Sequence, residues 1–87
     1  MDKDHIHILL LEDNETDAIL VQAELKFAMG DQISLVHAER LSDASRLIEQ
    51  QSFDLILTDL RLPDSDGIDT INRLRSIAAN IPIAVLS

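Results

Sequence analysis

Three acidic residues each follow an apolar segment closely, and their carboxylates are of the type that binds cations. Glu12 and Asp13 follow the apolar run 8–11, and Asp59 follows the run 55–57. A lone Asp at the end of a strand is most often a turn residue or a helix cap. Two such segments that are neighbours in a parallel sheet would bring all three carboxylates to one edge. Because crowded carboxylates repel one another and Mg²⁺ prefers oxygen ligands, the joint pattern predicts a shared Mg²⁺ site.

The elements that would position these acids alternate between strand and helix. Strands are expected at residues 5–13, 33–38, 53–59 and 81–87, and helices at 14–30, 42–52 and 68–78. Their apolar runs are continuous, which is typical of strands covered on both faces. Such alternation implies right-handed crossovers and a mostly parallel sheet between helices, so the fold class is α/β.

The ends of the helices carry recognisable signals. Asn14 is the expected N-cap of the first helix and Gly30 its stop, while Ser42 is the expected N-cap of the second helix. Pro63 and Gly67 mark a loop before the third helix. The inward-facing residues are expected to be Ala18, Val21, Leu25 and Ala28 in the first helix, Leu47 and Ile48 in the second, and Ile68, Ile71, Leu74 and Ile77 or Ala78 in the third.

Composition narrows the classes of function. The 87 residues have room for one domain, and their net charge is −9, with 16 acidic against 7 basic residues. Such a charge repels nucleic acid and anionic membranes, so neither is an expected partner. The chain has no cysteine, no apolar run of membrane-spanning length and no secretory signal, and we expect it in the cytoplasm.

Taken together, these stretches resemble the receiver domain of two-component response regulators. "ILLLEDN" resembles the first strand of that family with its acidic pair, and "DLILTDLRLPDSDG" resembles the phosphoacceptor strand and the loop after it. "IPIAVLS" resembles the fourth strand, which ends in a small hydroxyl residue. The resemblance runs along the whole chain. It implies a flavodoxin-like doubly wound sheet with the strands in the order second, first, third, fourth.

The resemblance also implies a phosphorylation switch. Asp59 would accept a phosphoryl group from a histidine kinase or a phosphotransfer protein. Mg²⁺ would be held by Asp13, Asp59, the backbone carbonyl of Arg61, and Glu12 acting through water. The hydroxyl of Ser87 would bind the phosphoryl group. The domain would be a phosphoacceptor of a signalling pathway, with self-phosphorylation and dephosphorylation as its only catalysis.

The family pattern continues beyond the last residue of this sequence. We therefore expect residues 1–87 to form a receiver domain without the family's final helix, strand and helix, and without the lysine that pairs with the phosphoryl group. Lys3 and Lys26 lie in the wrong elements to replace that lysine. The strand at 81–87 would then be an exposed apolar edge, which favours self-association.

Three alternatives compete with this interpretation. A calcium-binding loop around Asp64–Gly67 fails, because Leu62 and Arg73 would occupy positions that require acids. An aspartyl phosphohydrolase needs a second acid two residues after the nucleophile, where Arg61 stands. A receiver-like interaction module that is never phosphorylated, or an inactive fragment, stays open. His5, His7 and His37 have no metal-site spacing and are interpreted as strand or surface residues.

Overall fold

The computed structural model describes residues 5–86. The elements are β1 (Ile6–Leu11), α1 (Glu15–Met29), a 3₁₀ turn (Gly30–Gln32), β2 (Ile33–Ala38), α2 (Leu41–Gln50), β3 (Leu55–Thr58), β4 (Arg61–Leu62), β5 (Ser65–Asp66), α3 (Ile68–Ile77) and β6 (Ile83–Val85). Within this described part, none of the helices has both the length and the hydropathy that a membrane crossing requires.

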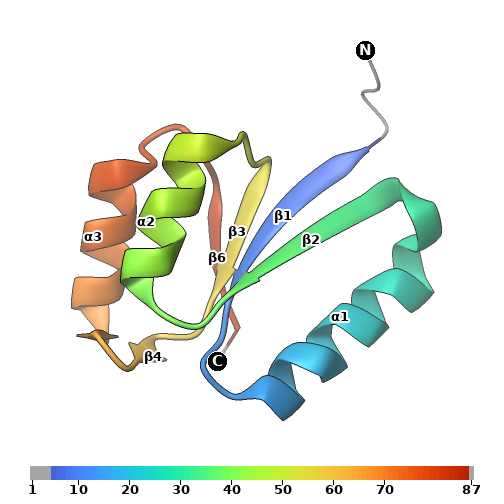
Figure 1. Ribbon diagram of the computed structural model, residues 1–87, viewed down its shortest axis with the longest axis horizontal. Helices are drawn as coiled ribbons and strands as arrows, with labels where there is room; N and C mark the ends of the chain where they lie inside the picture. The colour runs from blue at the N-terminus through green and yellow to red at the C-terminus, as the bar shows by residue number, and fades with distance from the viewer. Residues whose placement is uncertain (1–4, 87) are drawn as a thin grey trace.

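The main sheet has four parallel strands in the order β2-β1-β3-β6. Helices α2 and α3 lie against one face of the sheet and α1 against the other (Figure 1). The predicted α/β class, the parallel pairing and the strand order are therefore confirmed, with β6 as the fourth strand of the prediction. Register places Leu9 of β1 between Val36 of β2 and Ile56 of β3.

Strand β1 is the centre of the core. Leu9, Leu10 and Leu11 are all fully buried, although successive side chains point to opposite faces of a sheet. This burial explains the continuous apolar run, since a strand with helices on both sides has no solvent face. The core beneath α2 and α3 is formed by Leu9, Leu11, Ala38, Leu41, Ala44, Phe53, Ile56, Leu62, Leu74 and Ala78.

The predicted ends of α1 are confirmed. The side chain of Asn14 accepts a hydrogen bond from the N–H of Asp17 at 3.0 Å, which satisfies one free donor of the first turn. At the other end Gly30 has a φ of 61°, and its N–H donates to the carbonyl of Lys26. Only glycine adopts that conformation at low cost, so Gly30 ends the helix.

Ser42 is not the N-cap of α2, and this prediction was wrong. The helix begins at Leu41, and Arg40 occupies the cap position without a side-chain cap bond. The backbone N–H groups of Leu41 and Ser42 donate instead to the carboxylate of Asp64, far along the chain. An external carboxylate replaces the local hydroxyl because the loop after β3 lies against this helix end.

Two predicted inward positions are also wrong. Ala28 is exposed, and the inner stripe of α1 continues from Leu25 to the half-buried Met29, four residues on. Ile68 is 72% exposed because it lies about 120° around α3 from Leu74, at roughly 100° per residue. The stripe that α3 turns inward has Thr70, Leu74 and Ala78 at intervals of four residues, all of them buried.

The loop predicted between β3 and α3 contains a small hairpin. Strands β4 and β5 pair in antiparallel fashion, with Arg61 opposite Asp66 and Leu62 opposite Ser65. Leu62 is buried and belongs to the core, so the hairpin is anchored by packing as well as by its ladder. This segment follows Asp59 directly and therefore borders the acidic edge of the sheet.

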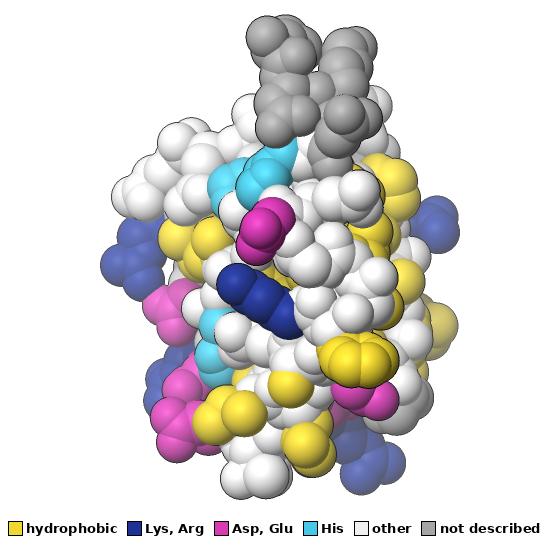
Figure 2. Space-filling view, turned by 90° about the vertical axis from the view of Figure 1, so that its right-hand side faces the viewer, with side chains coloured by type: hydrophobic (Ala, Val, Ile, Leu, Met, Phe, Trp, Pro, Cys, Tyr) yellow, Lys and Arg dark blue, Asp and Glu magenta, His cyan; other side chains and the backbone are white. Residues whose placement is uncertain are grey.

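Large apolar side chains also reach the surface, and half of those in the described residues lie on α1. Ile19, Leu20 and Phe27 are exposed, and the side chain of Phe27 is 95% accessible. Figure 2, which looks onto the side that carries β2 and α1, shows hydrophobic side chains among charged and neutral ones. The outer surface of α1 is thus less polar than the charge of the whole chain implies.

Candidate metal centre

Glu12, Asp13 and Asp59 converge at the carboxyl edge of the sheet. One carboxylate oxygen from each residue lies within 4.8 Å of the other two. They meet because β1 and β3 are parallel neighbours, so residues that follow these strands leave the sheet at the same place. The predicted convergence of the three acids is confirmed. The roles that the sequence suggests for them remain predictions.

The three acids differ in their contact with solvent. Glu12 is buried, with 5% of its surface accessible, whereas Asp59 is half-buried and Asp13 is exposed. Burial raises the pKa of the Glu12 carboxyl, a hydrogen bond from the N–H of Asn14 opposes this rise, and the charges of Asp59, Asp17 and Asp13 add to it. The folded chain thus holds a carboxylate in a place where its negative charge is unfavourable.

Backbone hydrogen bonds hold the acids in place. Glu12 accepts a bond from the N–H of Asn14 at Oε2, and Asp59 accepts one from the N–H of Arg61 at Oδ1, both at 3.2 Å. The N–H of Asp59 donates to the carbonyl of Leu11 at 3.0 Å, which extends the pairing of β1 and β3 to the acid itself. The main chain of Asp59 is therefore fixed by the ladder of the sheet.

Strand β2 holds the main chain of Glu12 from the other side. The N–H of Glu12 donates to the carbonyl of Ala38 at 3.0 Å, and the carbonyl of Glu12 accepts a bond from Nε2 of His37 at 2.6 Å. A carbonyl has no proton to give, so the ring nitrogen is the donor. His37, interpreted from sequence as an ordinary strand residue, thus contacts one of the three acids directly.

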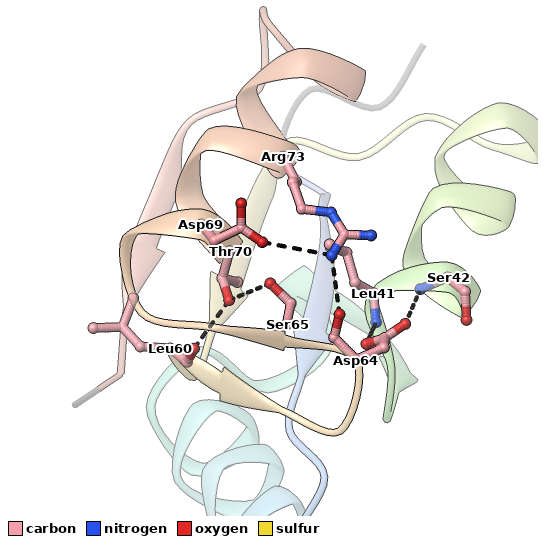
Figure 3. Close-up of polar contacts among 8 residues, drawn as sticks. All are labelled: Leu41, Ser42, Leu60, Asp64, Ser65, Asp69, Thr70 and Arg73. Atoms are coloured by element: carbon pink, nitrogen blue, oxygen red, sulfur yellow. Dashed lines mark hydrogen bonds and ion pairs between the residues drawn. The ribbon is translucent and has the colours of Figure 1, made fainter.

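The hairpin after β3 is tied to α2 by Asp64. Its carboxylate accepts hydrogen bonds from the N–H of Leu41 at 2.8 Å and of Ser42 at 3.0 Å (Figure 3). Burial raises the pKa of Asp64, but the backbone N–H groups of Leu41 and Ser42, together with its own N–H and the hydroxyl of Ser42, more than offset it, so that the pKa lies below the ordinary value. The backbone carbonyl of Asp64 accepts a further bond from Arg73 of α3 at 2.9 Å.

A second tie joins the start of the loop to α3. The hydroxyl of Thr70 donates to the carbonyl of Leu60 at 2.9 Å and lies 2.7 Å from the hydroxyl of Ser65 (Figure 3). Thr70 is fully buried, which makes these bonds costly to lose. The residues that follow Asp59 are therefore fixed to α2 and α3 at several points.

Arg61 and Ser87 are the other two residues with predicted roles at this site. Arg61 lies two residues after Asp59 at the start of β4, and its side chain is exposed, with a long 3.8 Å ion pair to Asp66. Its carbonyl as a metal ligand remains a prediction. Ser87 lies outside the described residues. The N–H of Leu86 donates to the carbonyl of Thr58 at 2.9 Å, so the last described residue is adjacent to the end of β3.

The donor set fits a hard divalent cation. All three side chains offer carboxylate oxygen, the ligand that Mg²⁺ and Ca²⁺ prefer, and within the described residues no histidine or cysteine joins the cluster. The arrangement thus fits a divalent cation held by carboxylate oxygens.

Comparison with known proteins identifies the family. The model of the response regulator receiver domain matches residues 8–87. The chain belongs to this family. Receiver domains are signalling domains of two-component systems, and this one has the expected sheet and acidic edge.

Curated relatives share this segment. The transcriptional regulatory protein ZraR of Escherichia coli (strain K12) is 30% identical over 87 residues, which cover 100% of this chain and 19% of ZraR. The cell cycle transcriptional regulator CtrA of Caulobacter vibrioides is 34% identical over 82 residues, which cover 94% of this chain and 34% of CtrA. This chain therefore spans between about a fifth and a third of the length of these relatives.

Solved structures of response regulators and receiver domains are similar to this chain in fold. The response regulator MaeR bound to beryllium trifluoride has a TM-score of 0.82 and 26% identity, over 93% of this chain and 66% of that one. The receiver domain of the sensor histidine kinase PA1611 from Pseudomonas aeruginosa, solved with a magnesium ion in its active site cleft, has a TM-score of 0.80 and 29% identity, over 95% of this chain and 67% of that one.

Two contacts at or beside this site were not predicted from the sequence. His37 has no metal-site spacing, and nothing in the sequence links it to Glu12. Asp64 stands in a turn-like stretch after Pro63, which favours a local role over a cap on a helix 22 residues earlier. Each contact joins separate elements, so it follows from the packing of β2 and α2 and not from any local pattern.

Proposed function

We propose that this receiver domain accepts a phosphoryl group on Asp59 from a histidine kinase or a phosphotransfer protein, in the cytoplasm, where receiver domains act. The observation that carries the proposal is the convergence of the Glu12, Asp13 and Asp59 carboxylates within 4.8 Å at the end of a parallel sheet. Membership of the receiver family supports the choice of donor. The net charge of −9 disfavours nucleic acid and anionic membranes as partners of the chain itself.

The transfer is a displacement at phosphorus. A carboxylate oxygen of Asp59 forms a new bond to the phosphorus atom while the bond from phosphorus to the donor imidazole nitrogen breaks. That nitrogen keeps the electron pair of the broken bond and takes a proton from solvent. Asp59 suits the role because it is half-buried and its Oδ1 is oriented by the N–H of Arg61.

Glu12, Asp13, Asp59 and the backbone carbonyl of Arg61 would hold Mg²⁺, with Glu12 acting through water. A bound Mg²⁺ offsets the negative charge of the phosphoryl group and of the acids. The receiver domain of PA1611, which is similar in structure, was solved with magnesium in its cleft. The carboxylate donors of this chain fit the same ion.

Ser87 is proposed to donate its hydroxyl to the phosphoryl group, on the basis of the family resemblance. Residues 1–87 are proposed to belong to a single receiver domain. Phosphorylation of this domain would change the state that a partner or an output recognises.

The proposal is tested with acetyl phosphate, a small phosphodonor. The folded protein is incubated with Mg²⁺ and acetyl phosphate, and its intact mass is measured. The same measurement is made on Asp59→Asn, which removes the acceptor, and on Asp66→Asn, which removes an exposed acid from the same loop. The proposal expects one phosphoryl adduct on the wild type and on Asp66→Asn, and none on Asp59→Asn.

The opposite results overturn it. An adduct that persists in Asp59→Asn would assign the phosphoryl group to another residue. A folded, Mg²⁺-binding wild type without an adduct would favour the alternative function, a receiver-like interaction module that is not phosphorylated. Circular dichroism establishes folding before each measurement.

We also propose that β6 mediates self-association. Among the described strands β6 pairs with β3 on one side, and Val85 is 46% exposed. An exposed apolar edge strand is a template for a second strand, and a charged residue at that edge blocks the pairing. Light scattering across a wide concentration range is expected to show dimers for the wild type and monomers for Val85→Lys. A wild type that stays monomeric throughout would refute this proposal.

A further inference from the structure

We propose that His37 is a positioning residue for the metal centre. Its Nε2–H fixes the main chain of Glu12 and thereby the direction in which the carboxylates of Glu12 and Asp13 face Asp59. The inference rests on the function proposed above and adds to it a residue on a different strand. The juxtaposition that carries it is a 2.6 Å hydrogen bond from the imidazole of β2 to the backbone carbonyl that joins the two acids.

The imidazole of His37 takes the place of a backbone hydrogen bond that is missing where the ladder between β1 and β2 ends. The N–H of Glu12 donates to the carbonyl of Ala38, the last residue of β2. In a continuing parallel ladder, the carbonyl of Glu12 would accept from the N–H two residues after Ala38, which belongs to Arg40. Arg40 instead becomes the N-cap of α2. The side chain of His37 supplies the donor that the departing strand no longer provides.

Two contacts with β2, one from His37 and one from Ala38, fix the peptide groups on either side of Glu12. The peptide before Glu12 is held through its N–H, and the peptide between Glu12 and Asp13 is held through its carbonyl. The side chain of Glu12 is held separately, by the N–H of Asn14 at Oε2. Without the imidazole, the peptide between Glu12 and Asp13 loses one of its restraints and gains rotational freedom.

That freedom matters because the three carboxylates repel one another. Their oxygens lie within 4.8 Å at the end of a sheet, so any loosened acid moves away from the others. A cation would then have to draw the acids together again as it binds, and part of its binding free energy would be lost. When a residue that orients a metal ligand through a hydrogen bond is replaced, the metal affinity typically falls about 10–100-fold.

The test compares two side chains of similar length. Gln at position 37 keeps an N–H donor that reaches the carbonyl of Glu12, whereas Met keeps the length and has no donor. Mg²⁺ is titrated into each folded variant and followed through the amide NMR signals of Glu12, Asp13 and Asp59. We expect His37→Met to bind Mg²⁺ about 10-fold more weakly than the wild type and His37→Gln to stay within about 3-fold of it.

Each outcome has a distinct meaning. Equal Mg²⁺ affinity for His37→Met and His37→Gln overturns the positioning role, even if both variants are less stable than the wild type. A wild type that binds no Mg²⁺ overturns the proposed metal centre itself. If His37→Met does not fold, His37→Thr replaces it: Thr suits a strand and is too short to reach Glu12, and the same loss is expected.

Discussion

The carboxylate of Asp64 accepts a hydrogen bond from the backbone N–H of Leu41 at 2.8 Å, although 23 positions separate the two residues. The first turn of α2 is therefore capped by the loop that follows β3. The start of this helix and the border of the candidate metal centre are thus parts of one structure, and a change in either is expected to affect the other.

Replacing Asp64 by Ala should destabilise the receiver domain. The N–H groups of Leu41 and Ser42 lose their acceptor, and the loss of an N-cap costs about 1–2 kcal/mol. Chemical denaturation followed by circular dichroism measures the change. Asp66→Ala is the matched control, because its side chain is 81% exposed and makes only a 3.8 Å ion pair, and it should change the stability by less than about 0.5 kcal/mol. Equal losses for the two variants would contradict the capping role.

The stabilisation by Asp64 should depend on pH. Its pKa is lower in the folded than in the unfolded chain, so its contribution is complete above the unfolded value of about 3.9 and is lost as the pH falls through the folded pKa. Asp64→Asn resembles the protonated carboxyl at every pH. The stability difference between the wild type and Asp64→Asn should therefore be constant near neutral pH and shrink below about pH 4. A difference that grows in acid would give the pKa shift the opposite sign.

Glu12→Gln should make the folded chain more stable when no cation is present. The pKa of Glu12 is raised in the fold, so its ionised form at neutral pH disfavours folding, and a neutral side chain removes that penalty. With Mg²⁺ at 100 times its Kd the wild type should gain about 2.7 kcal/mol. The variant should gain much less, because it lacks one of the three carboxylates.

Thermal unfolding of the wild type and of Glu12→Gln, each with and without Mg²⁺, measures these changes in stability. Asp17→Asn is a suitable control, since Asp17 contributes charge to the surroundings of Glu12 but does not belong to the cluster of three acids. A Glu12→Gln variant that is less stable than the wild type without Mg²⁺ would mean that the crowding of the acids is not a net cost to the fold.

Thr70→Val should lower stability by about 1–3 kcal/mol. Valine has nearly the same shape, but it leaves the buried hydroxyl of Ser65 and the carbonyl of Leu60 without their partner. The free energy of unfolding of Thr70→Val is compared with that of Thr16→Val, an exposed position on α1. If the two substitutions cost the same, the tie between the loop and α3 does not contribute to stability.

Sequence patterns predicted those features that are set by the period of an element and by its ends. The run of β1 is buried on both faces, and the run of β3 is buried on one face and half-buried on the other. Their continuous apolar composition indicated parallel strands, and the acids that follow neighbouring parallel strands meet at one edge of the sheet. Asn14 and Gly30 act on their own helix, and both predictions are confirmed.

Sequence patterns missed the contacts made between elements and misjudged the direction of some apolar side chains. Ser42 has the composition of an N-cap, yet Asp64 takes that role because the hairpin lies against α2. The contact that His37 makes could not be predicted from the sequence, because its partner is a backbone carbonyl, which every residue carries. Ile68 was placed inside by its apolar character, although its angle around α3 directs it to solvent.

The central position of β1 has a consequence for synthesis on the ribosome. In the finished sheet Leu9 lies between Val36 and Ile56, both of which are translated after it. At 5–20 residues per second, Ile56 is added about 2–10 s after Leu9. Until then the most deeply buried strand of the described sheet lacks its neighbour β3, so the nascent chain cannot complete the sheet before β3 leaves the exit tunnel.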